Sequence, residues 1–74
     1  MAFQDPLFDF RVSDIDTGGD PKYYGYLNRN GEWYVMMETA SDGSFRYAYG
    51  RSGYGAAWSG KAGLTYGLFS EIFP

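Results

Sequence analysis

The chain has 74 residues, enough for one small domain, and contains neither Cys nor His. Without Cys no disulfide or thiolate metal site can form, and without His the commonest general base and zinc ligand are missing, so we predict no enzyme, cofactor or metal. The net charge of −3 argues against nucleic acid as a partner, and no apolar run approaches the length of a membrane span.

Residues 1–22 combine five Asp with several large apolar side chains. Between residues 7 and 15, Phe8, Phe10 and Val12 alternate with polar residues, which favours an extended strand or arm over a helix. Such an arm needs a surface, either its own sheet or a neighbouring molecule. Apolar residues interleaved with acids suit a groove with apolar pockets and a basic rim, so we predict that the arm docks on another subunit.

The next segment, residues 23–37, has two runs rich in aromatic and β-branched residues on either side of a turn that begins at Asn28. Asn suits a type I turn, and Gly31 supplies the positive φ of a three-residue hairpin loop. This loop sets Asn28 opposite Glu32 and thereby fixes the register of the two strands. The expected cross-strand pairs are Leu27 with Trp33, Tyr26 with Tyr34, Gly25 with Val35 and Tyr24 with Met36.

A second turn follows at residues 39–44, where Gly43 has the same role as Gly31. A three-residue loop here pairs Glu38 with Arg46, and opposite charges facing each other across strands support that register. The two hairpins share a strand, so we predict a three-stranded antiparallel meander. The expected core face carries Tyr23, Gly25, Leu27, Trp33, Val35, Met37, Phe45, Tyr47 and Tyr49. The second face carries Tyr24, Tyr26, Tyr34, Met36, Glu38, Arg46 and Ala48.

Residues 50–63 contain five Gly, which predicts an irregular crossing with at most one helical turn. After Thr65, a suitable N-cap, apolar residues follow a helical spacing and predict a short C-terminal helix. The residues expected to cover the core face are Trp58, Leu64, Phe69 and Phe73. The predicted fold class is therefore mainly β or small α+β, with an N-terminal arm at residues 1–22 and a single domain at residues 23–74.

Three patterns resemble catalytic or metal-binding motifs but lack a necessary feature. The stretch 55–62 is close to a phosphate-binding loop, yet Ala62 stands where the Mg²⁺-binding hydroxyl should be. Residues 14–20 open like a calcium-binding loop, yet its twelfth position, Gly25, should be a bidentate Glu. The carboxylates on the meander could form a glycosidase-like pair but are more simply surface charges. They are Glu32, Glu38 and Asp42.

Aromatic residues make up 22% of the chain, more than so small a core can bury, so some of the eight Tyr must be exposed on the second face. Tyr and Trp are enriched in protein interfaces because they give a large contact area at low entropic cost, so we favour burial against another protein. The alternatives are stacking on sugar rings or on nucleic-acid bases. The predicted interface residues are Phe8, Phe10, Val12, Tyr24, Tyr26, Tyr34, Met36 and Arg46.

Residues 22–73 also resemble small structural-gene proteins of tailed bacteriophages. The likeness rests on the run from Tyr23 to Met36, followed by Phe45-Arg-Tyr-Ala, Tyr54, Trp58 and Leu64-Thr-Tyr. It includes no catalytic motif, so no functional residue is transferred. It implies a multi-copy virion component made in the cytoplasm of a bacterial host: a capsid decoration (cement) protein or a small tail or fibre accessory, with other virion proteins as partners. A glycan-binding module of a phage adhesin is the alternative.

Overall fold

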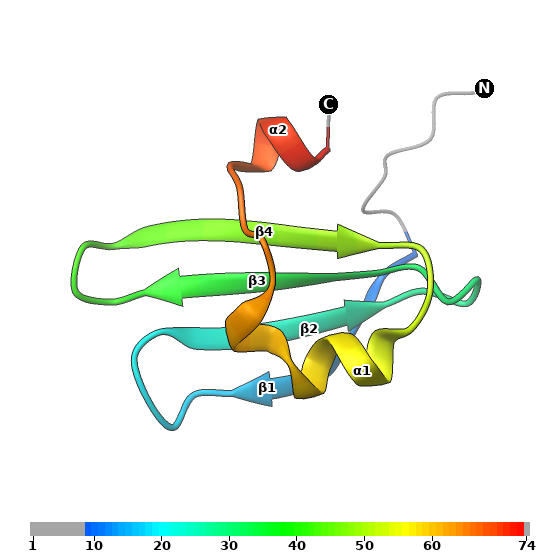
Figure 1. Ribbon diagram of the computed structural model, residues 1–74, viewed down its shortest axis with the longest axis horizontal. Coiled ribbons are helices and arrows are strands. Elements are labelled where there is room, and N and C mark those ends of the chain that lie inside the picture. Colours follow the sequence, from blue (N-terminus) through cyan, green and yellow to red (C-terminus); the bar gives the residue numbers. More distant parts are fainter. Residues whose placement is uncertain (1–8, 74) are drawn as a thin grey trace.

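The computed structural model of the protein describes residues 9–73, which form one antiparallel sheet and three short helices (Figure 1). The strands are β1 (Arg11–Asp16), β2 (Lys22–Leu27), β3 (Trp33–Thr39) and β4 (Ser44–Gly50), in the order β1-β2-β3-β4. The helices are α1 (Tyr54–Ser59), the 3-10 turn η1 (Lys61–Gly63) and α2 (Phe69–Ile72). The mainly β class is confirmed, but the prediction of three strands is wrong because residues 11–16 add a fourth.

β1 pairs antiparallel with β2 in the protein's own sheet. Residues 11–16, which the sequence predicted to dock on another subunit, therefore have a partner within the chain. The alternation of apolar and polar residues correctly predicted an extended strand. The earlier part of the predicted arm, including Phe8, lies outside the described residues.

The β2–β3 hairpin has the register predicted from its turn, with Leu27 opposite Trp33. The Asn28 side-chain oxygen accepts hydrogen bonds from the backbone N–H groups of Asn30 and Glu32, both at 3.0 Å. Gly31 has a φ of 86°, the left-handed conformation that glycine adopts without strain. The turn fixes the register because one Asn side chain satisfies two backbone donors of the loop.

The β3–β4 turn is one residue longer than predicted. Its loop has four residues, 40–43, and Thr39 pairs with Ser44 across it. Gly43, with a φ of 72°, donates its N–H to the Thr39 carbonyl at 2.8 Å. The Asp42 carboxylate accepts the Ser44 N–H at 3.0 Å and stabilises this wider turn.

The longer turn shifts the β3–β4 register by one residue. Glu38 faces Phe45 instead of Arg46, and Arg46 faces Met37. Because successive side chains of a strand point to opposite faces, the shift moves every β4 side chain to the other face. The core-face prediction is wrong for Phe45, Tyr47 and Tyr49, and the second-face prediction is wrong for Arg46 and Ala48.

The core face lies beneath α1, which is placed over β1 and β2 (Figure 1). Its buried cluster is Trp33, Val35, Ala48 and Ala57, surrounded by Tyr23, Leu27, Tyr54, Trp58, Leu64 and Tyr66. Two glycines let these large rings approach the sheet. A Cβ at Gly25 would overlap the Tyr54 hydroxyl and lie 2.9 Å from the Trp58 ring, and one at Gly50 would overlap the Trp33 indole. The packing of α1 therefore depends on a bare backbone at the centre of β2.

The segment after η1 leaves the core face along the outer edge of β4. There Tyr47 and Gly67 exchange two backbone hydrogen bonds, both of 2.8 Å. Beyond this bridge, α2 places Phe73 edge-on against Tyr34, with ring centroids 5.4 Å apart. The C-terminal segment consequently covers part of the second face.

The C-terminal helix is shorter than predicted and lies on a different face. It begins at Phe69, where the Leu68 N–H donates to the Glu71 carboxylate at 2.9 Å, so Thr65 is not its N-cap. Of the residues predicted to cover the core face, Trp58 and Leu64 do so, whereas Phe69 and Phe73 contact Tyr47 on the second face. No helix within residues 9–73 is long and apolar enough to cross a membrane.

Candidate interaction surface

The second face holds a cluster of aromatic rings at the end nearest the β2–β3 turn, which we call the closed half. The Tyr26 ring stacks on Tyr34, with centroids 4.4 Å apart and planes inclined by 14°. Phe10 and Phe73 meet Tyr34 edge-on, at centroid distances of 5.1 and 5.4 Å. Tyr34 is 8% exposed and Phe73 9%, so these rings form a small second core.

Phe69 and Phe73 also cover Tyr47, and we call the part of the second face that residues 9–73 leave uncovered the open half. Its apolar and aromatic side chains are Val12 and Ile15 from β1, Tyr24 from β2, Met36 from β3 and Phe45 from β4, and the charged pair of Lys22 and Glu38 lies on the same face. Val12, Ile15 and Phe45 are 54%, 59% and 44% exposed. Large apolar side chains that gather on one exposed face mark a site of contact with another molecule. The open half is therefore the candidate interaction surface.

The polar groups of the second face make local hydrogen bonds. The Tyr24 hydroxyl donates to the Glu38 carboxylate at 2.9 Å, and this bond raises the pKa of Tyr24. Glu32 accepts hydrogen bonds from the Asn28 side-chain amide at 2.7 Å and from the Tyr49 hydroxyl at 3.3 Å. No group of three or more acidic, His or Cys side chains in residues 9–73 could hold a metal ion. The face thus offers apolar area beside tyrosine hydroxyls and the Lys22 and Glu38 charges.

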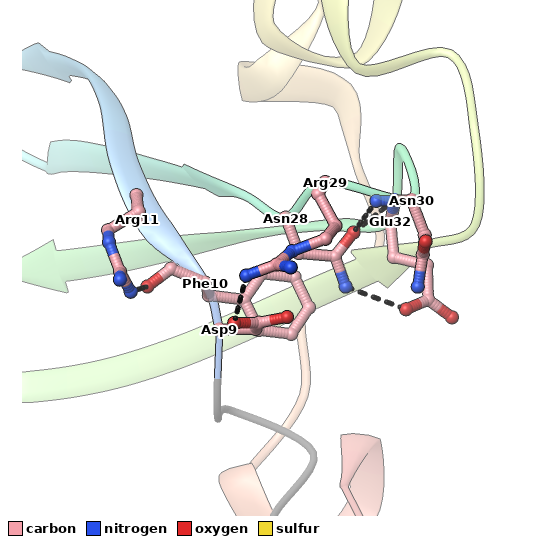
Figure 2. Close-up of polar contacts among 7 residues, drawn as sticks. All are labelled: Asp9, Phe10, Arg11, Asn28, Arg29, Asn30 and Glu32. Atoms are coloured by element: carbon pink, nitrogen blue, oxygen red, sulfur yellow. Dashed lines mark hydrogen bonds and ion pairs between the residues drawn. The ribbon is translucent and has the colours of Figure 1, made fainter.

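The start of β1, which lies at the closed half, is tied to the β2–β3 turn. The Asp9 carboxylate lies 3.1 Å from the Arg29 guanidinium, beside the hydrogen bonds that Asn28 makes within the turn (Figure 2). Asp9 has a φ of 87°, a left-handed conformation that Asp adopts more readily than most residues. This bend immediately precedes Phe10, whose ring packs on Tyr34.

The middle and the end of β1 are tied to the helices over the core face. The Tyr54 hydroxyl of α1 donates to Asp14 at 2.8 Å, and the Lys61 ammonium of η1 lies 3.2 Å from the Asp16 carboxylate. Lys61 also sits 4.5 Å from the centroid of the Trp58 ring, a cation–π contact. Burial and the bond to Asp14 raise the pKa of Tyr54 to about 12. A backbone N–H and the Lys61 ammonium lower the pKa of Asp16.

The predicted interface residues fall into different environments. Those in the open half are Val12, Tyr24 and Met36, and those in the closed half are Phe10, Tyr26 and Tyr34. Arg46 lies on the core face opposite Met37, and Phe8 lies outside the described residues. The predicted residues of β2 and β3 therefore share one face, but the sequence did not separate its buried end from its exposed end.

Sequence reasoning missed Ile15 and Phe45, two strongly exposed residues of the open half. Strict alternation would place Ile15 and Val12 on opposite faces of the sheet. A bulge between Val12 and Asp14 puts both side chains on the same face. Phe45 was missed because the β3–β4 loop was predicted to have three residues. The run from Ala40 to Gly43 was the available signal, since a four-residue loop also places a glycine last.

The comparisons with known proteins leave the resemblance to phage structural proteins as a prediction. The function is accordingly inferred from the exposed side chains of the open half and from the strand that borders it. Compared with protein families, curated proteins and solved structures, the chain has no match.

Proposed function

We propose that the protein is a structural component of a tailed-bacteriophage virion, either a capsid decoration protein or a small tail accessory, and that it packs its open half against another virion protein. The observation that carries the proposal is the gathering of Val12, Ile15 and Phe45, all between 44% and 59% exposed, on one side of the sheet. The resemblance of residues 22–73 to structural-gene proteins supplies the virion setting.

The size of the open half is consistent with a component held at many equivalent positions. Burial of a large apolar side chain contributes about 1.5–3 kcal/mol when it starts fully exposed. Val12, Ile15 and Phe45 start about half exposed, so together they contribute about 2–4 kcal/mol before the entropy of association is subtracted. A single contact of this size is weak, and repetition over a particle makes it effective.

Incorporation into virions tests this proposal. Virions are purified from hosts that express the wild-type chain or the double variant Ile15→Ser/Phe45→Ser, and copy number is measured by mass spectrometry and cryo-EM. The double variant should fold, as judged by circular dichroism, and should be depleted from particles. Ala56→Ser, at an exposed position of α1, is the control and should incorporate normally. Normal incorporation of the double variant would contradict the proposal.

A glycan-binding module is the alternative function. It is favoured by the Tyr24 ring with the Glu38 carboxylate beside it, since a sugar requires both a flat apolar surface and a hydrogen-bond acceptor. Glycan-array binding that Tyr24→Ala abolishes, from a protein that virions do not contain, would replace the virion proposal by this one.

A further inference from the structure

The two outer edges of the sheet are in different states. The edge of β4 is bridged by the chain itself, through the two hydrogen bonds between Tyr47 and Gly67. The edge of β1 meets no strand within residues 9–73, and every residue of β1 is exposed. An open strand edge presents unpaired N–H and C=O groups and is a template for another strand.

The register shows which groups of β1 point outward. Along an antiparallel strand in the middle of a sheet, successive residues bond alternately to the two neighbouring strands. The bond from the Asn28 N–H to the Glu32 carbonyl, at 3.0 Å, sets this phase: even-numbered residues of β2 bond toward β3 and odd-numbered residues toward β1. The partners of the odd-numbered residues are Arg11, Asp14 and Asp16. The N–H and C=O groups of Val12 and Ile15 therefore point away from the sheet.

The bulge in β1 makes the strand symmetric about its own midpoint. Residues three apart in a regular strand lie on opposite faces, but the bulge between Val12 and Asp14 puts Val12 and Ile15 on the same face. Arg11 and Asp16 lie together on the core face, opposite Leu27 and Tyr23. Read from either end, the strand presents a charged residue and then an apolar one, and the two charges are opposite in sign.

We propose that two copies of the protein pair through β1, antiparallel and about a two-fold axis, to form one continuous sheet with four strands from each copy. Val12 of one copy exchanges backbone hydrogen bonds with Ile15 of the other. Arg11 faces Asp16 across the junction. Each contact occurs twice because a two-fold interface uses the same patch on both copies.

Charge disfavours the register shifted toward the C-terminal end of β1. A two-fold axis through Ile15 would set Asp14 opposite Asp16 on both sides of the axis, and like charges directly opposite each other destabilise a strand pair. An axis between Ser13 and Asp14 instead matches Arg11 with Asp16. The side chain of Asp16 is 47% exposed despite its contact with η1, so a second cation can reach it.

The anchors of β1 favour pairing because they order the strand before a partner arrives. Asp9, Asp14 and Asp16 are bound by Arg29, Tyr54 and Lys61, respectively. An edge held in this way loses little conformational entropy on association. Since the two-fold axis is perpendicular to the sheet, both open halves then lie on the same side of the dimer.

Sedimentation equilibrium of the full chain tests the pairing. The wild type should be in reversible monomer–dimer equilibrium. Arg11→Asp and Asp16→Arg each turn two attractive pairs into repulsive ones and should weaken dimerisation about 30-fold. An equimolar mixture of the two variants restores both attractive pairs and should dimerise like the wild type. Arg51→Asp makes the same charge change at an exposed position after β4 and should leave dimerisation unchanged.

Hydrogen exchange of the wild type provides a second readout should Asp16→Arg fail to fold. The amides of Val12 and Ile15 should be protected at high protein concentration and exchange on dilution, whereas that of Asp14, directed toward β2, should stay protected throughout. A wild type that is monomeric at high concentration, concentration-independent exchange at Val12 and Ile15, or a mixture of folded variants that fails to associate would overturn the proposal. None of these outcomes decides virion incorporation, which depends on the open half.

Discussion

The two faces of the sheet are built in different ways. On the core face, glycines at positions 25 and 50 admit large rings, and Val35 at the centre is 0% exposed. On the second face, aromatic side chains pack on one another, and among residues 9–73 the covered part is the region around Tyr34 and Tyr47. The free energy of unfolding should therefore depend strongly on the core face and the closed half, and hardly at all on the open half.

The largest effect is expected for Trp33→Ala. Trp33 is 7% exposed and its indole N–H donates to the Ser52 carbonyl at 2.6 Å, so truncation leaves a cavity and an unpaired carbonyl. We expect a loss of about 3–5 kcal/mol, comparable to the whole stability of a domain this small. Urea unfolding followed by circular dichroism measures it. Phe45→Ala on the open half is the control and should change stability by less than about 0.5 kcal/mol.

Tyr34→Ala tests whether the closed half is a core. The substitution removes the stack with Tyr26 and the edge contacts with Phe10 and Phe73. We expect a loss of about 3 kcal/mol in the same unfolding experiment. The sequence had assigned Tyr34 to an interface, where the same substitution would leave the fold intact. If Tyr34→Ala lowered the free energy of unfolding no more than Tyr24→Ala does, the closed half would not act as a core.

Gly25→Ala tests the close approach of α1 to β2. The added methyl group would overlap the Tyr54 hydroxyl and crowd the Trp58 ring, so we expect a loss of about 1–3 kcal/mol. Gly55→Ala is a matched control inside α1, where a Cβ meets no atom within 4 Å. It should stabilise the protein by about 0.5–1 kcal/mol, because alanine favours a helix over glycine. Equal effects from both substitutions would refute the close packing.

Alkaline unfolding should produce the smallest effect, through the contact of Tyr54 with Asp14. Burial and this hydrogen bond raise the pKa of Tyr54 from its ordinary value of 10.0 to about 12. The folded protein therefore favours the neutral phenol, and this stabilisation is complete below pH 10 and lost as the pH rises through 12. Tyr54→Phe should show a smaller fall in the unfolding midpoint over that range than the wild type. Identical pH dependence in the two proteins would exclude the contribution.

The two hairpins show what local sequence can determine. The β2–β3 register was predictable because Asn28 bonds within its own turn. The β3–β4 turn has Gly43 in a left-handed conformation whether its loop has three residues or four. In the structure, the Asp20 carboxylate of the β1–β2 connection accepts the Ala40 N–H at 2.8 Å, a contact between residues far apart in the sequence. Local turn chemistry contains no information about that contact.

The candidate surface was predictable to a similar extent. Alternation along residues 7–15 predicted an extended strand, and Val12, which was predicted to belong to an interface, is 54% exposed. The pairing of β1 with β2 is reinforced by the hydrogen bond from Tyr54 to Asp14, two residues that are 40 positions apart in the sequence. Alternation alone therefore could not show whether the strand pairs within the chain. The bulge that brings Ile15 beside Val12 depends on the match to β2 and has no local signature.

The bridge between Tyr47 and Gly67 limits how far such a sheet can grow. A sheet with two free edges can add a neighbour at each, and repeated addition produces a filament of the kind found in amyloid. In this protein the C-terminal segment already occupies the β4 edge at Tyr47, so residues 9–73 leave one free edge, that of β1. In the proposed dimer that edge is used up, so growth would stop at two. The chain can then be crowded on a repeating surface without polymerising there.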